Sequence, residues 1–341
     1  MECNEEMGKR WQEKSRRKTP WDGSSEMTAT QEFLQKTYQE HYQQRHPALR
    51  ETGEAVMINT FIPSQCPICG ELQFKKDGMD HNGIQRYKCM KGHKFRPTTG
   101  TIFDSRKISV SEWIEYCLNV FRYVSLNAGS WNNKNALSTS KYWLNKLFLT
   151  LDGYQEDIVL SGKVYLDETY YTVRMRDIIV HEDGSKLRGI SGNQICIGVA
   201  TDKKHTVCLL EGYGRPTMQK SYETFKSHIA SGSTLIHDKE KTHRLLLETL
   251  NLKNVSYAAN QLKGVADQDN PLDPVNRRHY LLKKFLNAHS GFNRDDLQGY
   301  LNLFAFVMNP PKSPLEKVDI ILNLAFNSPK SLRYRDQFKS F

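Results

Sequence analysis

Long apolar runs are missing from this sequence of 341 residues, which has no stretch approaching the ~18 apolar residues needed to cross a bilayer. We therefore expect no membrane segment. The first residues, Met1 to Lys18, are charged throughout and lack the apolar stretch of a secretory signal, so we expect no signal peptide. Internal repeats and low-complexity tracts are also absent. The length predicts roughly two or three domains at the usual ~100–200 residues each.

Cysteine is scarce, and its distribution is uneven. Seven cysteines are present, an odd number, and Cys66, Cys69 and Cys89 fall close together. In a chain without a signal peptide this pattern argues against a disulfide framework and for a metal site.

Acidic residues are outnumbered by basic ones. Lys and Arg total 48 against 38 for Asp and Glu, a net charge of +10. Such an excess is typical of proteins that bind polyanions, although many basic proteins have only a basic surface. Between Thr60 and Lys107 there are nine basic and four acidic residues, so about half of the net charge lies in one short segment. This concentration favours a nucleic-acid partner.

That segment, residues 59–107, has the spacing of a zinc ribbon. Cys66-Pro-Ile-Cys69 is followed by Cys89-Met-Lys-Gly-His93, which suits a closed tetrahedral Zn²⁺ site. A β-ribbon of this size has too little core to fold alone, and Zn²⁺ supplies the missing free energy. His93 fits best as the fourth ligand, and His81 is the alternative. Arg86, Lys88 and Lys94 flank the site and predict a phosphate-binding surface, with a structural, protein-facing ribbon as the alternative.

Residues 1–58 are polar and basic. Leu34, Tyr38 and Tyr42 recur at helical spacing, so we expect a helix from about Thr30 to Arg45 and disorder elsewhere. A cluster of basic residues between Lys9 and Lys18 fits either a DNA-contacting arm or a solvated tail.

Residues 108–152 are predicted to be helical. Ser109, followed by Glu112, fits a capping box, with Ser111 as the alternative cap. A second helix from Ser138 resembles the recognition helix of a helix-turn-helix. The segment from Gly129 to Asn135 is a poor helix former, so a packing helix with no DNA role is an equal alternative. The face of the second helix that we expect to be open carries Lys141, Tyr142, Asn145 and Lys146.

Residues 160–309 predict an α/β domain in which a mixed sheet is flanked by helices. Five strands are expected, beginning near Val164, Gln194, His205, Thr234 and Val255. Helices are expected over Thr217–Ile229, Lys239–Leu250, Val275–Ala288 and Arg294–Met308. Residues 310–341 form a C-terminal extension whose role the sequence does not indicate.

Two acids in this domain follow apolar strand segments. Asp167 follows Val164-Tyr165-Leu166, and Asp238 follows Leu235-Ile236-His237. A carboxylate placed where apolar burial stops costs stability unless it has a use. Phosphoryl transfer on DNA commonly uses two divalent metals held by acids that converge from separate elements. We therefore predict that Asp167 and Asp238 meet and bind Mg²⁺.

The sequence resembles insertion-sequence transposases that carry an N-terminal zinc ribbon and a ribonuclease-H-like DDE domain, in the subgroup where Asn replaces the third acid and a Lys is added. The resemblance covers about residues 60–308. It departs from the commoner pattern in ending the ribbon with Cys-x3-His rather than Cys-x2-Cys. The stretches that carry it are the Cys66/Cys69/Cys89 ribbon with Phe95–Phe103, Tyr165–Thr169, His237-Asp238, and Asn276–Lys283 with Ser290–Phe292 and Leu297–Leu301.

The resemblance implies a ribonuclease-H-like fold and a catalytic set. Asp167 and Asp238 would be the metal-binding acids, and Asn276 would take the third position through its side-chain oxygen. Lys283 and His279, on the same face of the helix as Asn276, would contact the DNA phosphate. The neighbouring Glu168 is expected on the opposite face of the strand, so we assign it a structural role.

A polar insert between the first two strands, residues 174–192, carries Arg174 and Arg176. Its position predicts a hairpin that faces the DNA, with a solvated loop as the alternative.

The resemblance implies a transposase that binds terminal inverted repeats and target DNA, cuts the ends and joins them. Two ends must be handled together, so we expect a homodimer or larger assembly on DNA, in the cytoplasm of a bacterium and associated with the nucleoid. The alternatives are a zinc-ribbon DNA-binding protein with a decayed catalytic domain, and a metal-dependent nuclease on the same fold.

Overall fold

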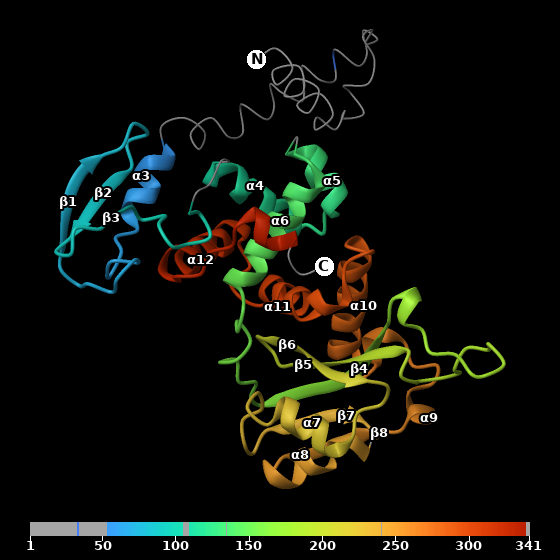
Figure 1. Ribbon diagram of the computed structural model, residues 1–341. Helices are drawn as coiled ribbons and strands as arrows, with labels where there is room; N and C mark the ends of the chain where they lie inside the picture. The colour runs from blue at the N-terminus through green and yellow to red at the C-terminus, as the bar shows by residue number, and fades with distance from the viewer. Residues whose placement is uncertain (1–32, 34–52, 105–108, 134, 240, 339–341) are drawn as a thin grey trace. The chain divides into compact units, whose positions relative to one another are not determined.

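The computed structural model describes residues 33, 53–104, 109–133, 135–239 and 241–338 (Figure 1). The predicted helix over 30–45 and the basic cluster over 9–18 lie outside these ranges, apart from a single helical residue, Phe33. The chain divides into two compact units, one up to Thr150 together with the segment from Pro314, and one over Leu151–Ser313. Among the described residues, every helix is too short or too polar to span a bilayer.

The first unit begins with helix α3 and a small antiparallel sheet of order β1-β2-β3. Its interior is aromatic: the rings of Phe74, Tyr87 and Phe95 lie with their centroids 5.4–5.6 Å apart. Cys66 and Cys89 are buried in the same cluster. So small a core explains why this fold needs a further source of stability. The bounds are α3 Gly53–Thr60, β1 Phe74–Met79, β2 Gln85–Cys89 and β3 Lys94–Phe95.

The helical part of the first unit contains α4, α5, α6 and α12. Ser109 caps α4, because its hydroxyl accepts a hydrogen bond of 3.1 Å from the main-chain N–H of Glu112, as the sequence predicts. The poor helix-forming segment before α6 nevertheless contributes to a short helix, α5, capped by Ser125. The C-terminal helix α12 packs against α4 and α6. The bounds are α4 Val110–Phe121, α5 Leu126–Asn132, α6 Leu137–Thr150 and α12 Pro314–Asn327.

The second unit is built on a five-stranded mixed sheet of order β6-β5-β4-β7-β8. Strands β4, β5 and β6 are antiparallel neighbours, whereas β7 and β8 run parallel to β4. Three antiparallel strands followed by two parallel ones on the other side of the first strand is the ribonuclease-H-like arrangement, which confirms the predicted fold class. The bounds are β4 Lys163–Thr172, β5 Gln194–Thr201, β6 Thr206–Tyr213, β7 Thr234–Asp238 and β8 Lys253–Tyr257.

Helices cover both faces of this sheet (Figure 1). Helices α10 and α11 pack on β4, β5 and β6 from one side, and α7 packs with β6 and α8 on the other. A short 3-10 segment, η2, leads from β7 into α8. The bounds are α7 Met218–Phe225, η2 Lys241–His243, α8 Arg244–Thr249, α9 Ala259–Leu262, α10 Asp273–Ala288, η4 Arg294–Asp296 and α11 Leu297–Met308.

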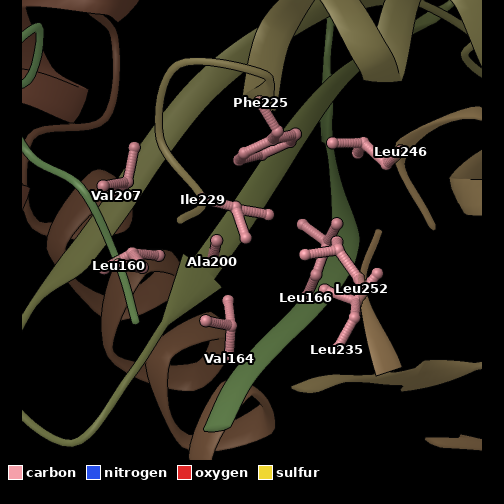
Figure 2. Close-up of a cluster of buried hydrophobic side chains, with 10 residues drawn as sticks. All are labelled: Leu160, Val164, Leu166, Ala200, Val207, Phe225, Ile229, Leu235, Leu246 and Leu252. Carbon is pink, nitrogen blue, oxygen red and sulfur yellow. The ribbon is translucent and has the colours of Figure 1, made fainter. Parts of the chain in front are cut away.

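The core between the sheet and α7/α8 fixes which way β4 faces (Figure 2). Val164 and Leu166 are fully buried there with Phe225 and Leu246. Each such side chain contributes about 1.5–3 kcal/mol of transfer free energy when it is fully buried. Because side chains alternate along a strand, the backbone of β4 directs Asp167 to the opposite face, toward α10. The apolar pattern of β4 thus places the first predicted acid.

Candidate metal centres and nucleic-acid interface

Three thiols and one imidazole converge in the first unit. The ligand atoms of Cys66, Cys69, Cys89 and His93 all lie within 4.8 Å of one another. The Sγ atoms of Cys69 and Cys89 are 3.9 Å apart, and Cys89 Sγ lies 3.6 Å from His93 Nδ1. A regular tetrahedron with Zn–S bonds of ~2.3 Å has S···S edges of about 3.8 Å. The donor set and its spacing therefore fit Zn²⁺.

The structure separates the two histidines that the sequence left as candidates for the fourth ligand. His93 belongs to the group, whereas His81 is exposed in the β1–β2 turn. Burial raises the pKa of the Cys89 thiol, but hydrogen bonds from the main chain and side chain of His93 outweigh burial and bring that pKa to about 7. Cys89 is thus easily converted to the thiolate that a metal ion needs.

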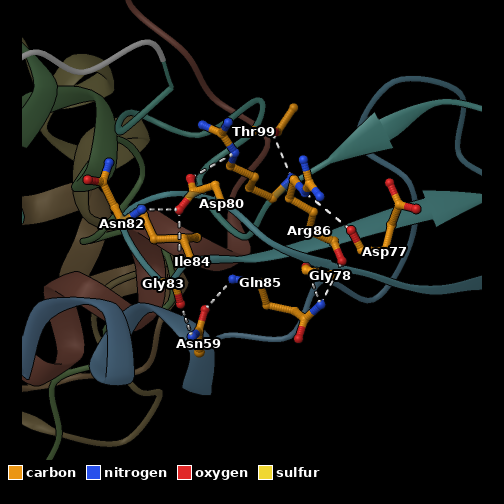
Figure 3. Close-up of polar contacts among 11 residues, drawn as sticks. Asn59, Asp77, Gly78, Asp80, Asn82, Gly83, Ile84, Gln85, Arg86 and Thr99 are labelled. Atoms are coloured by element: carbon orange, nitrogen blue, oxygen red, sulfur yellow. Dashed lines mark hydrogen bonds and ion pairs between the residues drawn. The ribbon is translucent and has the colours of Figure 1, made fainter.

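Turn residues hold the ribbon in shape and tie it to α3 (Figure 3). Asp80 Oδ1 accepts hydrogen bonds from the main-chain N–H groups of Asn82 and Ile84, at 2.9 and 3.0 Å. The side chain of Asn59 accepts from the N–H of Gln85 at 2.8 Å and donates to the carbonyl of Gly83 at 2.9 Å. The turn is therefore anchored on both sides. Strands β1 and β2, on either side of it, pair in register from Phe74 opposite Cys89 to Lys76 opposite Tyr87, and the pairing shifts at a bulge before Met79.

That register lines up three lysines across the ribbon. Lys88 on β2 lies directly opposite Lys75 on β1 and Lys94 on β3. Like charges directly opposite one another destabilise a sheet. One acid, Asp77, approaches the row, with its Oδ2 3.5 Å from Lys94 Nζ. We call Lys75, Lys88 and Lys94 the lysine row; it has the charge expected of a surface that binds phosphates.

Arg86 stands apart from the lysine row. Its Nε donates to the main-chain oxygen of Asp77 at 3.2 Å, so part of its hydrogen-bonding capacity is used within the ribbon (Figure 3). Arg86 remains half-buried, and a DNA contact by it stays a prediction.

The face of α6 that the sequence predicts to be open is partly covered. Lys146 is buried, with its Nζ 4.5 Å from the centre of the Tyr142 ring. The hydroxyl of Tyr142 donates to the carbonyl of Leu332 at 2.6 Å, and its ring packs against Tyr334. The C-terminal extension occupies this part of the helix, which corrects the prediction of an open face. DNA contacts by Lys141 and Asn145, both half-buried, stay predictions.

The insert after β4 forms a short hairpin, with an antiparallel bridge between Val180 and Lys186. Arg174 has partners within the chain: Nε donates to Asp177 Oδ2 and an Nη to Asn293 Oδ1, each at 2.6 Å. The side chain of Arg176 is 73% exposed. Of the two arginines predicted to meet DNA, Arg176 is the better placed.

Asp167 and Asp238 meet, and Glu168 joins them. One carboxylate oxygen from each of the three lies within 4.8 Å of the others. Two oxygens at Mg–O distances of ~2.0–2.1 Å on opposite sides of one ion are about 4.2 Å apart, so this spacing suits a hard divalent cation. Asp167 and Asp238 are half-buried, as befits groups that hold a cation facing a solvent-borne substrate.

The sequence assigns Glu168 a structural role, and the structure brings its carboxylate into one group with those of Asp167 and Asp238. Pairing between β4 and β7 stops at Leu166 and His237, and β7 ends one residue later at Asp238. Beyond that point, among the described residues, no strand pairs with β4 on the β7 side. The longer side chain of Glu168 reaches the space that Asp167 enters from the other face. Its side chain is only 7% exposed, and this burial is the signal that sequence reasoning lacked.

Burial and neighbouring negative charges change the pKa of Asp167. Burial, with the neighbouring charges of Asp238 and Glu168, raises the pKa of Asp167 to about 7. Burial also opposes ionisation of Glu168, but the hydrogen bond from His243 outweighs it and lowers the pKa of Glu168. One acid is therefore ready to give up a proton near neutral pH, and its neighbour is already ionised.

Helix α10 supplies the remaining predicted residues. His279 Nε2 lies 3.3 Å from the main-chain oxygen of Asp167, and burial lowers the pKa of His279 to about 4, so its imidazole is neutral. The approach of its Nδ1 to Asp167 Oδ2, 3.7 Å, is therefore not an ion pair. Asn276 and Lys283 are exposed, one turn before and one turn after His279. The charge of Lys283 contributes to the low pKa of His279, so Lys283 lies near that imidazole.

Comparisons with known proteins add little to this geometry. No family model and no curated protein matches the chain. An intasome of simian T-cell lymphotropic virus in complex with the PP2A regulatory subunit B56 gamma aligns with a TM-score of 0.28 and 10% identity, over 55% of this chain and 66% of that one. The Mos1 mariner paired end complex with Mn aligns with a TM-score of 0.22 and 13% identity, over 62% and 78%. With TM-scores this low, neither likeness indicates a function for this chain.

Proposed function

We propose that this chain is a DNA transposase of an insertion sequence. It binds the terminal inverted repeats of its own element, cleaves the DNA there and joins the freed 3′ hydroxyls to target DNA, using Mg²⁺. The observation that carries the proposal is the meeting of Asp167, Glu168 and Asp238 beside β4 of a ribonuclease-H-like sheet. A module that only binds DNA has no use for three carboxylates in one place, because they repel phosphates.

The reaction fits an acid-rich site. Divalent cations, when bound, would supply stabilisation of the attacking and leaving oxygens of an in-line displacement at phosphorus. Asp167 and Asp238 would hold the cations, and Asn276 would offer its side-chain oxygen from α10. His279 fixes α10 against β4 through the main chain of Asp167. Lys283, exposed on the same helix face, contacts a phosphate of the bound DNA.

The first unit provides a DNA-binding surface. Its ribbon holds Zn²⁺ through Cys66, Cys69, Cys89 and His93, and it presents the lysine row to the phosphate backbone. Contacts of this kind position a protein without reading sequence. We propose that further contacts come from Arg86, Lys141, Asn145, Arg174 and Arg176. Two ends must be brought together, so the active species is a homodimer or larger assembly on DNA.

The test is a cleavage and joining assay with purified protein, Mg²⁺, a plasmid target and a labelled duplex carrying the inverted repeat that flanks the gene. Asp238→Asn removes one charge and keeps the shape of the side chain. We expect wild-type protein to yield joined product and the variant to bind DNA without cleaving it. Cleavage without joining would make the protein a nuclease. Binding without cleavage by wild type would make it a DNA-binding protein with a decayed catalytic domain.

A further inference from the structure

A chain of hydrogen-bonded side chains runs from strand β8 to the acids. Asn254 Oδ1 lies 3.1 Å from His237 Nε2. His237 Nδ1 lies 3.0 Å from His243 Nδ1, and His243 Nε2 lies 2.9 Å from Glu168 Oε1. Asn254 is exposed, whereas the side chain of His243 is fully buried. The chain therefore connects the surface at β8 to the carboxylate beside Asp167.

Donor and acceptor roles along the chain follow from its two ends. The oxygen of Asn254 only accepts, so His237 donates from Nε2 and has a bare Nδ1. His243 must then donate to His237 from Nδ1 and to Glu168 from Nε2. Both ring nitrogens of His243 are thus donors, and turning the ring over would put carbon atoms in their places and break both hydrogen bonds. The position of Glu168 Oε1 is fixed by a ring that is itself fixed at both nitrogens.

An ordinary core contact does not explain this arrangement. Burying an acid and two imidazoles costs free energy that apolar residues of the same volume would not require. Glu168 Oε1 is held by His243, and a carboxylate oxygen of Glu168 lies within 4.8 Å of the oxygens of both aspartates. The buried chain holds the carboxylate in a place where it repels two others. Such an arrangement is useful only when a cation sits among them.

We propose that Glu168 is a third carboxylate of the metal centre and that His243 is a positioning residue that aims it at the cation. The inference rests on the proposed metal centre, and it assigns the centre a ligand from β4 in addition to Asn276 on α10. Residues that hydrogen-bond to a metal ligand commonly affect metal binding, because they set the orientation of that ligand and tune its affinity for the metal. His237 and Asn254 act through His243 and touch no ligand oxygen of Glu168.

The inference is tested by measuring Mn²⁺ binding to the full-length protein without DNA. The electron paramagnetic resonance signal of free Mn²⁺ reports how much of the ion is bound. We expect Glu168→Gln and His243→Leu each to raise the dissociation constant of Mn²⁺ by about 10-fold or more. His243→Gln, which keeps one donor for Glu168, should recover part of the affinity. Glu248→Gln is the control, because Glu248 is a carboxyl of α8 outside the acidic group and pairs with Arg244, and we expect less than about a 2-fold change.

The outcomes separate this inference from the proposed function. If Asp167→Asn and Asp238→Asn lose Mn²⁺ binding while Glu168→Gln binds like wild type, the inference is overturned and the metal centre stands. If the two aspartate variants bind like wild type, the metal centre itself is overturned. A purely structural role for His243 predicts a lower melting temperature with an unchanged Mn²⁺ affinity, which also overturns the inference.

A second measurement needs no variant and decides the matter should the Glu168 variants fail to fold. The ring nitrogens of ¹⁵N-labelled histidine are followed by NMR while Mg²⁺ is added to wild-type protein. We expect the Nε2 signal of His243 to shift, because its acceptor carboxylate becomes a cation ligand. His228, whose Nδ1 bonds the carbonyl of Ile158 at 3.0 Å, is the internal control. An unchanged His243 signal at saturating Mg²⁺ would contradict the inference.

Discussion

His279 Nε2 lies 3.3 Å from the main-chain oxygen of Asp167, so the middle of α10 is held against the strand that carries the first acid. Residues one turn away on either side of His279 share its helix face. Asn276 and Lys283 occupy these positions. The contact therefore gives a structural reason for expecting both residues to act near the acids, and it offers a way to test the expectation.

Lys283→Gln should reduce the rate of DNA joining by about 10²-fold or more, because it removes a fixed positive charge near the reacting phosphate. Lys284→Gln is the matched control: Lys284 is the next residue, equally exposed, and its Nζ lies 4.6 Å from the centre of the Tyr280 ring. Single-turnover joining rates measure the difference. Equal rates for the two variants would remove Lys283 from the catalytic set.

Zinc content tests the ribbon. We expect wild-type protein to bind one zinc ion per chain, and His93→Ala and Cys89→Ser to lose it. His81→Ala and Cys196→Ser should keep it, since neither residue belongs to the ligand group. Zinc binding supplies about 10–16 kcal/mol to folding in zinc-finger peptides, so chelation should unfold the ribbon. Zinc retention by His93→Ala together with zinc loss by His81→Ala would reverse the assignment of the fourth ligand.

If the lysine row binds phosphates, it should contribute to the salt dependence of the DNA affinity. Replacing Lys75, Lys88 and Lys94 by Gln should weaken binding to every DNA sequence alike, and each lost phosphate contact should flatten the plot of log affinity against log salt by about 0.9. Fluorescence anisotropy at several salt concentrations gives this slope. Lys203→Gln, in the exposed β5–β6 turn, is the control. An unchanged slope in the triple variant would leave the row without a role in DNA binding.

The raised pKa of Asp167 predicts a pH-dependent response to Mg²⁺. Its folded-state pKa, about 7, lies above the unfolded value. In the metal-free protein the stability linked to this group is present at low pH and lost as the pH rises through about 7. Mg²⁺ binds the ionised carboxylate, so the rise in melting temperature on adding Mg²⁺ should grow between about pH 6 and about pH 8.

Asp167→Asn is the control for this response. It should abolish most of the rise and its dependence on pH, because the amide does not titrate. An equal rise for wild-type protein at both pH values would show that Asp167 is not a metal ligand.

Features encoded locally could be predicted from the sequence. Strand β5, Gln194–Thr201, begins at the predicted residue, because its apolar residues are bounded by a polar turn on each side. The cap at Ser109 is likewise a matter of neighbouring residues. Asp238 ends β7 as predicted, whereas Asp167 lies in the middle of β4, which continues to Thr172. The two acids still meet, because β4 and β7 are parallel neighbours with Leu166 opposite His237.

Features that depend on contacts between residues far apart in the sequence could not be predicted. Glu168 and His243 are 75 residues apart, and no local pattern links them. The alternation rule gives the direction of Glu168 but not the end of β7 that opens the space beside it. Tyr142 is covered by residues 190 positions further along the chain, and the sequence contains no sign of that contact.

The central claim is that the acids of the second unit drive attack by a DNA 3′ hydroxyl. The most direct measurement compares two precut inverted-repeat ends in the joining assay, one with a 3′ hydroxyl and one with a 3′-deoxy terminus. We predict joined product from the hydroxyl end with wild-type protein, and none from the deoxy end or from Asp238→Asn with either end. Joining by Asp238→Asn, or no joining by wild-type protein bound to both ends in Mg²⁺, would contradict the account.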